Sequence, residues 1–482
     1  MGAVTDISHT FDHNPDQEPP REFETQLLHA GRFPDILGSC AVPVYSSAAF
    51  EFNSISHGAR LLNLTQFGNI YSRFTNPTVN TLQNRLAELE GGVAACAVAS
   101  GSAAVAMTIL ALAGAGDNFV SSFHVHAGTF HQFSTLATQM GIECRFVKSR
   151  DPVDFAAAID DKTKFVWVES ISNPGNVILD FEALSLVCHA KGVPLICDNT
   201  FGCAGYFCRP IDHGVDILVH SATKWIGGHG TTVGGIIVDS GAFDWGSHAD
   251  RFPQFHDPRT RLWERFSHRS FAIRCQFEIL RDTGSTLSAA AAQQLLIGLE
   301  SLAVRCERHA QNTAEIADWL REQPLVAWVN YVGHQDHRDH REALRYFKRG
   351  FGSVICFGLK GGFEASARLC DAFKMIMITT NLGDAKTLVV HPASTTHEHF
   401  SPHDRAEVGV TEDMIRLSVG IENIKDIKAD FQQAFEQVLH AGTSKIREVK
   451  GGKIQLQDEI NGHLYGPSAR PWARVREGGN MG

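Results

Sequence analysis

Lys224 lies in a segment whose residue types could carry out covalent chemistry on a carbonyl group. It follows the apolar run at residues 216–220, with Ser221 and Thr223 just before it and a glycine cluster just after it. A lysine in a desolvated pocket can lose its proton near neutral pH and form a Schiff base. The two hydroxyls could hold a phosphate. The segment suggests a lysine that binds pyridoxal phosphate (PLP), although a lysine that merely ends a strand before a glycine turn fits the same pattern.

Two further groups would suit the same cofactor. Asp198 ends an apolar run, where a lone charge is costly, so the pyridine nitrogen of PLP would be a fitting partner. A carboxylate that caps the following turn is the alternative. Ser100, Gly101 and Ser102 open a predicted helix, whose free N–H groups could bind the phosphate. A plain N-cap serine explains Ser100 equally well, and only the combination of these groups favours PLP.

Two arginines could bind anionic groups of the cofactor or the substrate. Tyr71 and Arg73 stand two residues apart in a predicted loop and could both reach one phosphate, although a surface pair is the commoner explanation. Arg416 lies inside the apolar run at residues 414–418, where an unpaired guanidinium would be expensive. It could bind a substrate carboxylate with two hydrogen bonds, or it could belong to a buried ion pair.

The pattern along the chain predicts an α/β protein with a mainly parallel sheet that is covered by helices on both faces. Helical spacing at residues 78–90 and 181–190 alternates with short apolar runs. In such sheets ligands bind at the carboxyl ends of the strands. Glu169, Asp198 and Ser221 each follow such a run, so we expect them at one edge. The predicted strands are residues 118–123, 144–147, 165–168, 195–197, 217–219 and 234–238.

Changes in composition divide the chain into four regions. The first 22 residues are polar and contain three prolines, which is typical of a loosely docked arm. A helix-rich stretch at residues 287–319 leads out of the sheet domain, and strands at residues 353–359 and 414–418 indicate a smaller one. The predicted regions are an N-terminal arm (1–65), a large PLP-binding domain (66–285), a C-terminal α/β domain (286–443) and a peripheral tail (444–482).

The composition argues for a cytoplasmic protein without nucleic-acid or membrane partners. The formal net charge is -10 and no basic stripe is visible, which disfavours binding to a phosphate backbone. No apolar run approaches the length of a membrane span, and no signal-peptide pattern is visible. The 11 cysteines are scattered singly, as expected for buried thiols in a reducing compartment.

Two groups of histidines invite a metal interpretation that we do not adopt. His334, His337 and His340 lie in a charged segment without cysteine, which is typical of a solvated loop. His124 and His126 have a spacing that could hold a metal, but the sequence offers no third ligand. We therefore predict no metal site.

With these residues assembled, the chain resembles the Cys/Met-metabolism family of PLP enzymes from about residue 23 to residue 439. The segment around Lys224 matches the lysine signature of that family. The resemblance implies the aspartate-aminotransferase fold, PLP fold type I, with Lys224 as the Schiff-base lysine and Asp198 as the partner of the pyridine nitrogen. It also implies a group of phosphate-binding residues. These are Gly101, Ser102, Ser221 and Thr223.

The resemblance extends to a second subunit and to the substrate. Tyr71 and Arg73 would reach the phosphate held by the neighbouring subunit, so the minimum active unit would be a homodimer and a homotetramer is expected. Asn173 would approach the phenolic oxygen of the PLP ring and help to bind the substrate. Arg416 would hold the substrate α-carboxylate. Lys224, Tyr71 and His126 would be the catalytic groups.

Within that family, segments at residues 381–387, 391–397 and 252–266 look like O-acetylhomoserine sulfhydrylases, which implies O-acetyl-L-homoserine as a substrate. One position departs from the pattern. The family usually has a tyrosine that stacks on the cofactor and moves protons, whereas this chain has His126 in His-Ala-Gly-Thr. We expect the imidazole to stack on PLP and to titrate near neutrality.

The segment around His126, with residues 27–34, is similar to the fungal γ-class PLP enzymes of loline alkaloid biosynthesis. That likeness implies γ-substitution, in which acetate leaves and the amine of L-proline adds at Cγ. A sulfhydrylase that uses sulfide to make L-homocysteine, or a γ-lyase, is the alternative. A nicotinamide oxidoreductase would need a G-x-G-x-x-G turn after its first strand, and we find none.

Overall fold

The structure is a computed structural model of the 482-residue chain, and it describes residues 21–32, 37–398, 403, 405 and 408–449. The first 20 residues of the predicted N-terminal arm and residues 450–482 of the predicted tail lie outside this described part.

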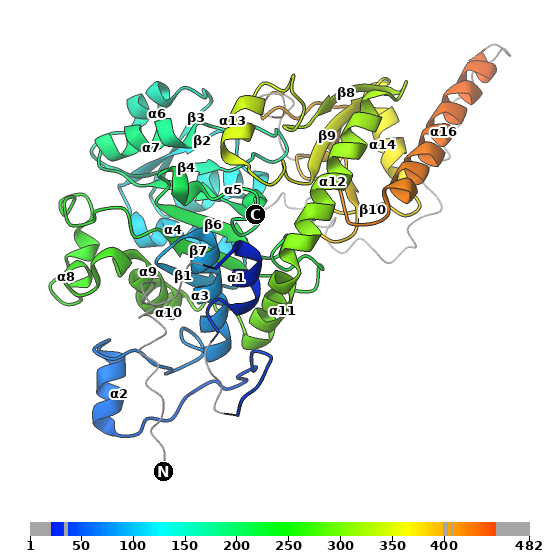
Figure 1. Cartoon of the computed structure of the whole chain (residues 1–482). Coiled ribbons are helices and arrows are strands. Elements are labelled where there is room, and N and C mark those ends of the chain that lie inside the picture. Colours follow the sequence, from blue (N-terminus) through cyan, green and yellow to red (C-terminus); the bar gives the residue numbers. More distant parts are fainter. Residues whose placement is uncertain (1–20, 33–36, 399–402, 404, 406–407, 450–482) are drawn as a thin grey trace, which may run out of the picture.

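A seven-stranded sheet forms the centre of the larger part of the molecule (Figure 1). Its strand order is β1-β7-β6-β5-β4-β2-β3, and β7 alone runs antiparallel to both of its neighbours. The mainly parallel α/β fold predicted from the alternating pattern is therefore confirmed. The strands are β1 (Ala94–Val98), β2 (Asn118–Ser122), β3 (Glu143–Val147), β4 (Thr163–Glu169), β5 (Leu195–Asp198), β6 (Ile217–Ser221) and β7 (Gly235–Asp239).

Helices cover both faces of this sheet because its strands are apolar on both sides. Leu195 and Cys197 pack into one core with α3, α7 and α11, whereas Ile196 packs into a second core with α4 and α9 on the opposite face. Such continuous apolar strands are typical of a doubly covered sheet. The helices of this part are α3 (Pro77–Glu90), α4 (Gly101–Leu112), α5 (Ala127–His131), α6 (Pro152–Ala158), α7 (Phe181–Ala190), α8 (Leu262–Phe266), α9 (Ser270–Arg274), α10 (Arg281–Thr283) and α11 (Ala289–Glu300).

Two short helices precede the sheet. α1 (Phe23–His29) packs against α3 through the buried Phe23 and Leu27. α2 (Ile55–Leu62) lies far from the sheet in Figure 1, and Ile55 and Leu62 are exposed in the single chain.

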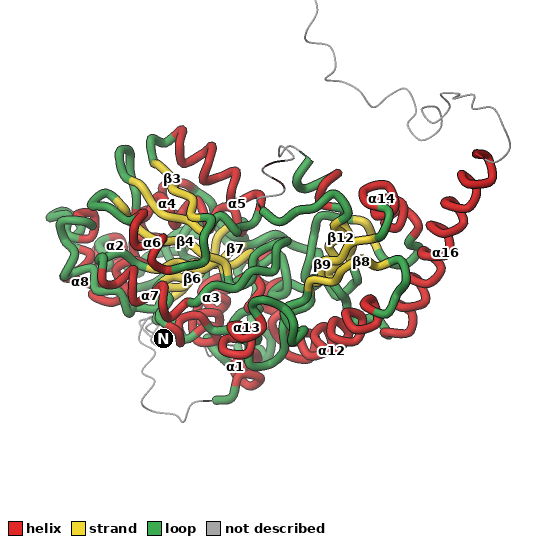
Figure 2. Tube along the Cα trace, turned by 90° about the horizontal axis from the view of Figure 1, so that it is seen from above, coloured by secondary structure: helices red, strands yellow, loops and turns green. Residues whose placement is uncertain are grey.

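A second sheet of five strands follows, with the order β10-β11-β12-β9-β8 (Figure 2). The sequence predicted only β9 and β12 of these strands. The helices α12, α14 and α16 pack against this sheet, and α16 continues past residue 444, where we predicted the start of a tail. The elements are α12 (Leu302–Arg321), β8 (Val326–Asn330), α13 (His340–Tyr346), β9 (Val354–Leu359), α14 (Gly362–Ala372), β10 (Met377–Ile378), β11 (Leu388–Val390), β12 (Met414–Ser418) and α16 (Ile424–Val449).

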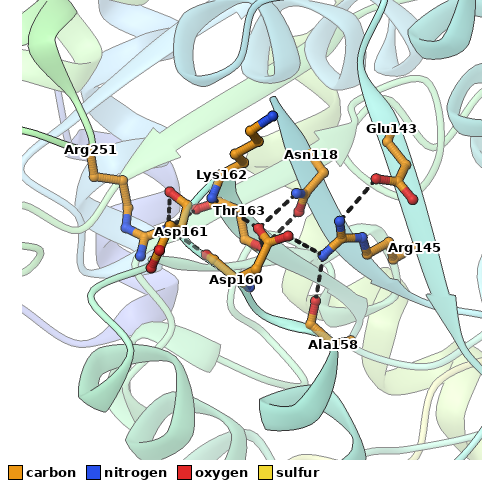
Figure 3. Close-up of polar contacts among 9 residues, drawn as sticks. All are labelled: Asn118, Glu143, Arg145, Ala158, Asp160, Asp161, Lys162, Thr163 and Arg251. Carbon is orange, nitrogen blue, oxygen red and sulfur yellow. Dashed lines mark hydrogen bonds and ion pairs between the residues drawn. The ribbon is translucent and has the colours of Figure 1, made fainter. Parts of the chain in front are cut away.

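A polar network ties together the amino ends of the strands in the large sheet (Figure 3). The Asp160 carboxylate accepts hydrogen bonds from Asn118 Nδ2 (2.8 Å) and the Lys162 N–H (2.9 Å) and pairs with Arg145 Nη1 (2.7 Å). The hydrogen bond from Asn118 is the largest of several that lower the pKa of Asp160. Arg251 Nη1 donates to the carbonyls of this same turn. The network is a structural feature, because it lies at the edge away from the carboxyl ends of the strands.

Candidate active site

The polar residues that end three adjacent strands meet at the carboxyl edge of the large sheet. Glu169 ends β4 and lies directly opposite Asp198, which ends β5, and Ser221 ends the next strand, β6. Lys224 follows Ser221 within one turn, and its N–H donates to the Ser221 carbonyl at 3.2 Å. The strand order therefore places these groups side by side.

Lys224 lies between the two sheets. Its Nζ donates to Asn381 Oδ1 at 2.6 Å, and Asn381 comes from the irregular segment between β10 and β11. Desolvation, together with the nearby charge of Arg416, lowers the pKa of Lys224 to about 8. A substantial fraction of the amine is therefore neutral and nucleophilic near physiological pH.

Asp198 was interpreted from the sequence either as a cap of the following turn or as a partner of the pyridine nitrogen, and its contacts are compatible with both. Its Oδ1 caps the following turn by accepting hydrogen bonds from the N–H (3.0 Å) and the hydroxyl (2.6 Å) of Thr200. No residue of the described part donates to Oδ2. Desolvation raises the pKa of Asp198, against the effect of the hydrogen bonds from Thr200. One oxygen thus fixes the carboxylate, and the other is open to a ligand.

The start of α4 packs so closely against the end of β6 that a side chain at Gly101 would not fit. A Cβ added at Gly101 would come within 2.8 Å of Ser221 Cβ. Ser100 is the N-cap of α4, because its hydroxyl accepts from the Ala103 N–H at 3.0 Å, so Gly101 and Ser102 are the first helical residues. The Thr223 hydroxyl donates to the Gly234 carbonyl at 3.3 Å and accepts from the Gly234 N–H at 3.1 Å. Helix N–H groups beside a serine hydroxyl form a cradle that suits a phosphate.

Arg416 carries a charge that no protein carboxylate neutralises. It is buried in β12, and no carboxylate of the described chain lies within ion-pair distance of it. Nη1 donates to Asn173 Oδ1 (3.3 Å), Nη2 donates to two backbone carbonyls, and Nε is buried without a partner. Desolvation lowers the pKa of Arg416 to about 10, so it remains a cation at neutral pH. A buried ion pair is not its explanation, and an anionic ligand would suit it.

His126 differs from the sequence prediction in its protonation. Its Nδ1 accepts a hydrogen bond from the Gly128 N–H at 3.2 Å, so the neutral ring carries its proton on Nε2. Desolvation and the charges of Lys224 and Arg416 lower the pKa of His126 to about 4. His126 is exposed in the single chain, and its lowered pKa favours the neutral ring, a hydrogen-bond donor, over the near-neutral titration that the sequence suggested.

Glu169 holds the backbone next to this ring. Its Oε1 accepts from the His126 N–H at 2.6 Å. Burial, with the neighbouring charge of Asp198, raises the pKa of Glu169 well above its ordinary value. The sequence predicted Glu169 at this edge of the sheet, and in the structure its carboxylate holds the backbone of His126 there.

Tyr71 and Arg73 do not join this cluster in the single chain. Arg73 Nη1 donates to the Arg281 carbonyl, and the Arg73 carbonyl accepts from Thr286. Tyr71 is 44% exposed. Their predicted action on a neighbouring subunit stays a prediction.

The segment with His334, His337 and His340, here called the histidine cluster, was predicted as a solvated loop, and this prediction is wrong for most of its residues. His334 and Asp339 are buried, and His337 and His340 are half-buried, because the segment packs against the large domain. Within the described residues, no group of three or more His, Cys, Asp or Glu side chains could hold a metal ion.

Sequence reasoning missed two residues that contact the central groups. Thr200 was considered only as part of a turn, although its place two residues after Asp198 is a signal for side-chain capping. Asn381 carries no such signal, because only the packing of the second sheet brings it to Lys224.

The sequence of the whole chain can now be compared with known proteins. Residues 24–436 match the family described as Cys/Met metabolism PLP-dependent enzymes. The chain belongs to this family. It is therefore a PLP-dependent enzyme with PLP fold type I, and the predictions of fold, cofactor and enzyme class are confirmed.

Relatives of this family cover nearly the whole chain. The sulfhydrylase-like protein lolC1 of Epichloe uncinata is 81% identical over 469 residues, which are 97% of this chain and 99% of that protein. O-acetyl-L-homoserine sulfhydrylase 1 of Thermus thermophilus is 47% identical and covers 86% of this chain and 99% of its own length. A solved structure of a putative O-acetylhomoserine (thiol)-lyase from Campylobacter jejuni, which carries N'-pyridoxyl-lysine-5'-monophosphate, has a TM-score of 0.84 at 36% identity. It covers 86% of this chain and 100% of its own.

The residues present at the sheet edge fit PLP. The depressed pKa of Lys224 suits a Schiff-base lysine, the open Oδ2 of Asp198 suits a protonated ring nitrogen, and the cradle at Gly101 suits a phosphate. No helix in the described part of the chain is both long and apolar enough to cross a bilayer.

Proposed function

We propose that this enzyme catalyses γ-substitution on O-acetyl-L-homoserine in the cytoplasm, with L-proline as the nucleophile, as in loline-type alkaloid biosynthesis. The observation that carries the substrate class is Arg416, a buried cation near Lys224 that pairs with no carboxylate of the described residues. Such a cation suits the α-carboxylate of an amino acid. The names of the relatives, one sulfhydrylase-like and one an O-acetyl-L-homoserine sulfhydrylase, support the choice of an O-acetylated homoserine.

PLP, when bound, accepts the electron pairs that proton removal leaves on the substrate carbons. With PLP bound, Lys224 would take the α-proton of the substrate and later return it, and its hydrogen bond to Asn381 limits where Nζ can lie. Asp198 keeps a proton on the ring nitrogen, and Arg416 holds the carboxylate. A β-proton would also have to leave, and its electron pair would form a Cβ–Cγ double bond as acetate leaves Cγ with the electrons of the C–O bond. The proline nitrogen would then bond to Cγ and lose its proton, and Cβ and Cα would each regain one.

His126 favours an amine over sulfide as the nucleophile in this proposal. Its neutral ring presents an N–H and no basic nitrogen to the open side of the site, since Nδ1 is bonded to the Gly128 N–H. It can therefore donate to an acceptor such as a carboxylate. Proline carries such a carboxylate, and sulfide does not.

Product analysis tests the proposal. The purified holoenzyme is incubated with O-acetyl-L-homoserine alone, with L-proline or with sulfide, and the products are identified by mass. We expect a proline adduct of the four-carbon amino-acid unit and free acetate, and none with Lys224→Ala. Incorporation of sulfide alone would establish the sulfhydrylase alternative, and 2-oxobutanoate with ammonia in all three mixtures would establish the γ-lyase.

A further inference from the structure

The histidine cluster of the C-terminal domain contacts the loop of the large domain that carries Asn173. Residues 172–178 follow β4, and residues 331–339 follow β8. The Asn330 side chain donates from Nδ2 to the Gly175 carbonyl at 3.1 Å, and the backbone carbonyl of Asn330 accepts from Asn176 Nδ2 at 2.9 Å. Two reciprocal hydrogen bonds thus join β8 to this loop.

His337 fixes the orientation of the Asn330 amide. Its Nδ1 accepts from the Asp339 N–H at 3.0 Å, so the proton of the neutral ring is on Nε2. Nε2 lies 2.7 Å from Asn330 Oδ1, which it can only reach as a donor. The Asn330 Nδ2 must then face the Gly175 carbonyl. The ring therefore determines which end of the amide meets the loop.

The loop depends on this support. Asn176 has a positive φ of 53°, a conformation that asparagine adopts more readily than most residues but that still carries strain. Asp339 adds a further contact, because its Oδ2 accepts from the Ile178 N–H at 3.2 Å. On the opposite side, Asn173 Oδ1 accepts from Arg416. The Asn173 amide is thus held between the substrate arginine and the loop.

We propose that Asn330, oriented by His337, is a positioning residue that sets the place of Asn173 against the PLP ring. The inference rests on the proposed function, a PLP enzyme that acts on an amino acid, and on the place of Asn173 beside the phenolic oxygen of the ring, which the resemblance to the family implies. An N–H donor at that oxygen stabilises its anionic form, which lowers the pH at which the visible absorption band of bound PLP titrates. Loss of the Asn330 contact should therefore move this midpoint to higher pH.

Two substitutions at one position separate this role from general stability. An asparagine at position 337 can replace the acceptor that Nδ1 of His337 provides, but its side chain is too short to reach Asn330. A glutamine at the same position can replace the donor that Nε2 of His337 provides. We expect His337→Asn to raise the midpoint by about half a pH unit, as for the loss of part of one hydrogen bond. His337→Gln should remain near the wild type. His334→Asn is the matched control, because His334 bonds to Asp318 and not to the loop.

Hydrogen–deuterium exchange in the holoenzyme supplies a second readout. We expect faster exchange in residues 172–178 for His337→Asn but not for His337→Gln. Asn176→Gly, which keeps the positive φ and removes one of the two bonds, should also exchange faster. Unchanged exchange and an unchanged midpoint in His337→Asn would overturn the inference, as would an equal shift in His334→Asn. Faster exchange without a spectral shift would overturn the link to Asn173.

Both measurements are made without amino-acid substrates. An incorrect assignment of the nucleophile would therefore appear in the product analysis and would leave these two readouts unchanged.

Discussion

At the scale of single residues, the site works through side chains whose protonation is set by their surroundings. Lys224 is brought toward neutrality by desolvation and by a cation, and His126 is kept neutral by the same causes. Asp198 is held by Thr200 and stays available to a ring nitrogen. These shifts lie at one edge of the sheet and favour the neutral forms of Lys224 and His126, and such clusters of shifted pKa values are typical of catalytic sites.

The pKa of Lys224 predicts how the uptake of PLP depends on pH. Only the neutral amine attacks the aldehyde, so the rate at which apoenzyme gains its visible absorption band should rise with pH and level off above about pH 8. Arg416→Leu removes a cation that disfavours the charged amine, so the pKa of Lys224 rises and the midpoint should move to higher pH. Lys224→Arg should form no band at any pH. A rate that is flat between pH 6 and pH 10, roughly two units either side of that pKa, would contradict this account.

At the scale of elements, the site depends on the close approach of α4 to β6. Helix α4 begins at Gly101, directly against Ser221, so that its N–H groups and the serine hydroxyl face the same space. This contact is steric and has no tolerance for a side chain. The phosphate cradle is therefore a property of two elements together.

Gly101→Ala should weaken PLP binding. The new methyl group would lie 2.8 Å from Ser221 Cβ and 2.9 Å from Ser221 Cα, so the helix would have to move away from the strand. Overpacking of this kind costs about 1–3 kcal/mol, which corresponds to an increase of about fivefold to more than a hundredfold in the dissociation constant of PLP. Gly114→Ala, where the nearest atom is 3.9 Å away, is the control and should bind PLP as the wild type does.

The network around Asp160 predicts a stability effect without a change in catalysis. Asp160→Ala removes the acceptor for Asn118 and Arg145, and we expect a loss of about 1 kcal/mol, since Asp160 is largely exposed and solvent weakens its ion pair. The pKa of Asp160 is lowered by folding, so its contribution is present at neutral pH and is lost as the pH falls below the pKa of the unfolded carboxylate, about 4, toward that of the folded one. Urea denaturation at pH 7 and at about pH 3 measures this difference. Asp161→Ala, whose side chain is not in the network, should behave as the wild type at both values.

The sequence predicted those elements whose burial leaves a clear pattern. β4, β5 and β6 are apolar on both faces, which made them recognisable within a residue or two. β1 escaped notice because four of its five residues are Ala or Cys, and β10 and β11 are only two and three residues long. The direction of β7 depends on its pairing with β1 and β6, which apolar spacing does not encode.

The candidate site was predictable to the extent that its residues end strands. Asp198 and Lys224 follow apolar runs of one sheet, so a single rule about strand ends placed them together. Asn381 and Asn330 reach the site from the second domain, and no local pattern indicates such a contact. The site of the proton on the His126 ring could not be predicted either, because it follows from the hydrogen bond between Nδ1 and the Gly128 N–H.

At the scale of the whole molecule, the single chain leaves two predicted phosphate ligands without a role. Tyr71 and Arg73 lie on the segment between α2 and α3, and several apolar side chains before them are exposed, including Val44, Tyr45 and Ile55. Exposed apolar residues of this number suit a subunit interface. We therefore keep the homodimer as the proposed active unit and the homotetramer as its assembly.

Mixing two inactive variants tests the shared site. In a dimer of one Lys224→Ala subunit and one Arg73→Ala subunit, one site would contain both intact residues if Arg73 acts across the interface. Random reassortment of equal amounts should restore about a quarter of the wild-type activity, because half of the dimers are mixed and each has one intact site. If Arg73 serves its own subunit, mixing restores nothing.

The hydroxyl of Thr200 links the two ends of the PLP site. It donates to Asp198, which would face the ring nitrogen of PLP, and accepts at 2.8 Å from the N–H of Ser221, which would border its phosphate. The Thr200 hydroxyl oxygen therefore fixes the distance between Asp198 and Ser221, the residues proposed to bind the two ends of the cofactor. A ligand with a longer or shorter distance between its nitrogen and its phosphate could bind at one of these places only by straining its contacts at the other. The site would therefore select its cofactor by length as well as by chemistry.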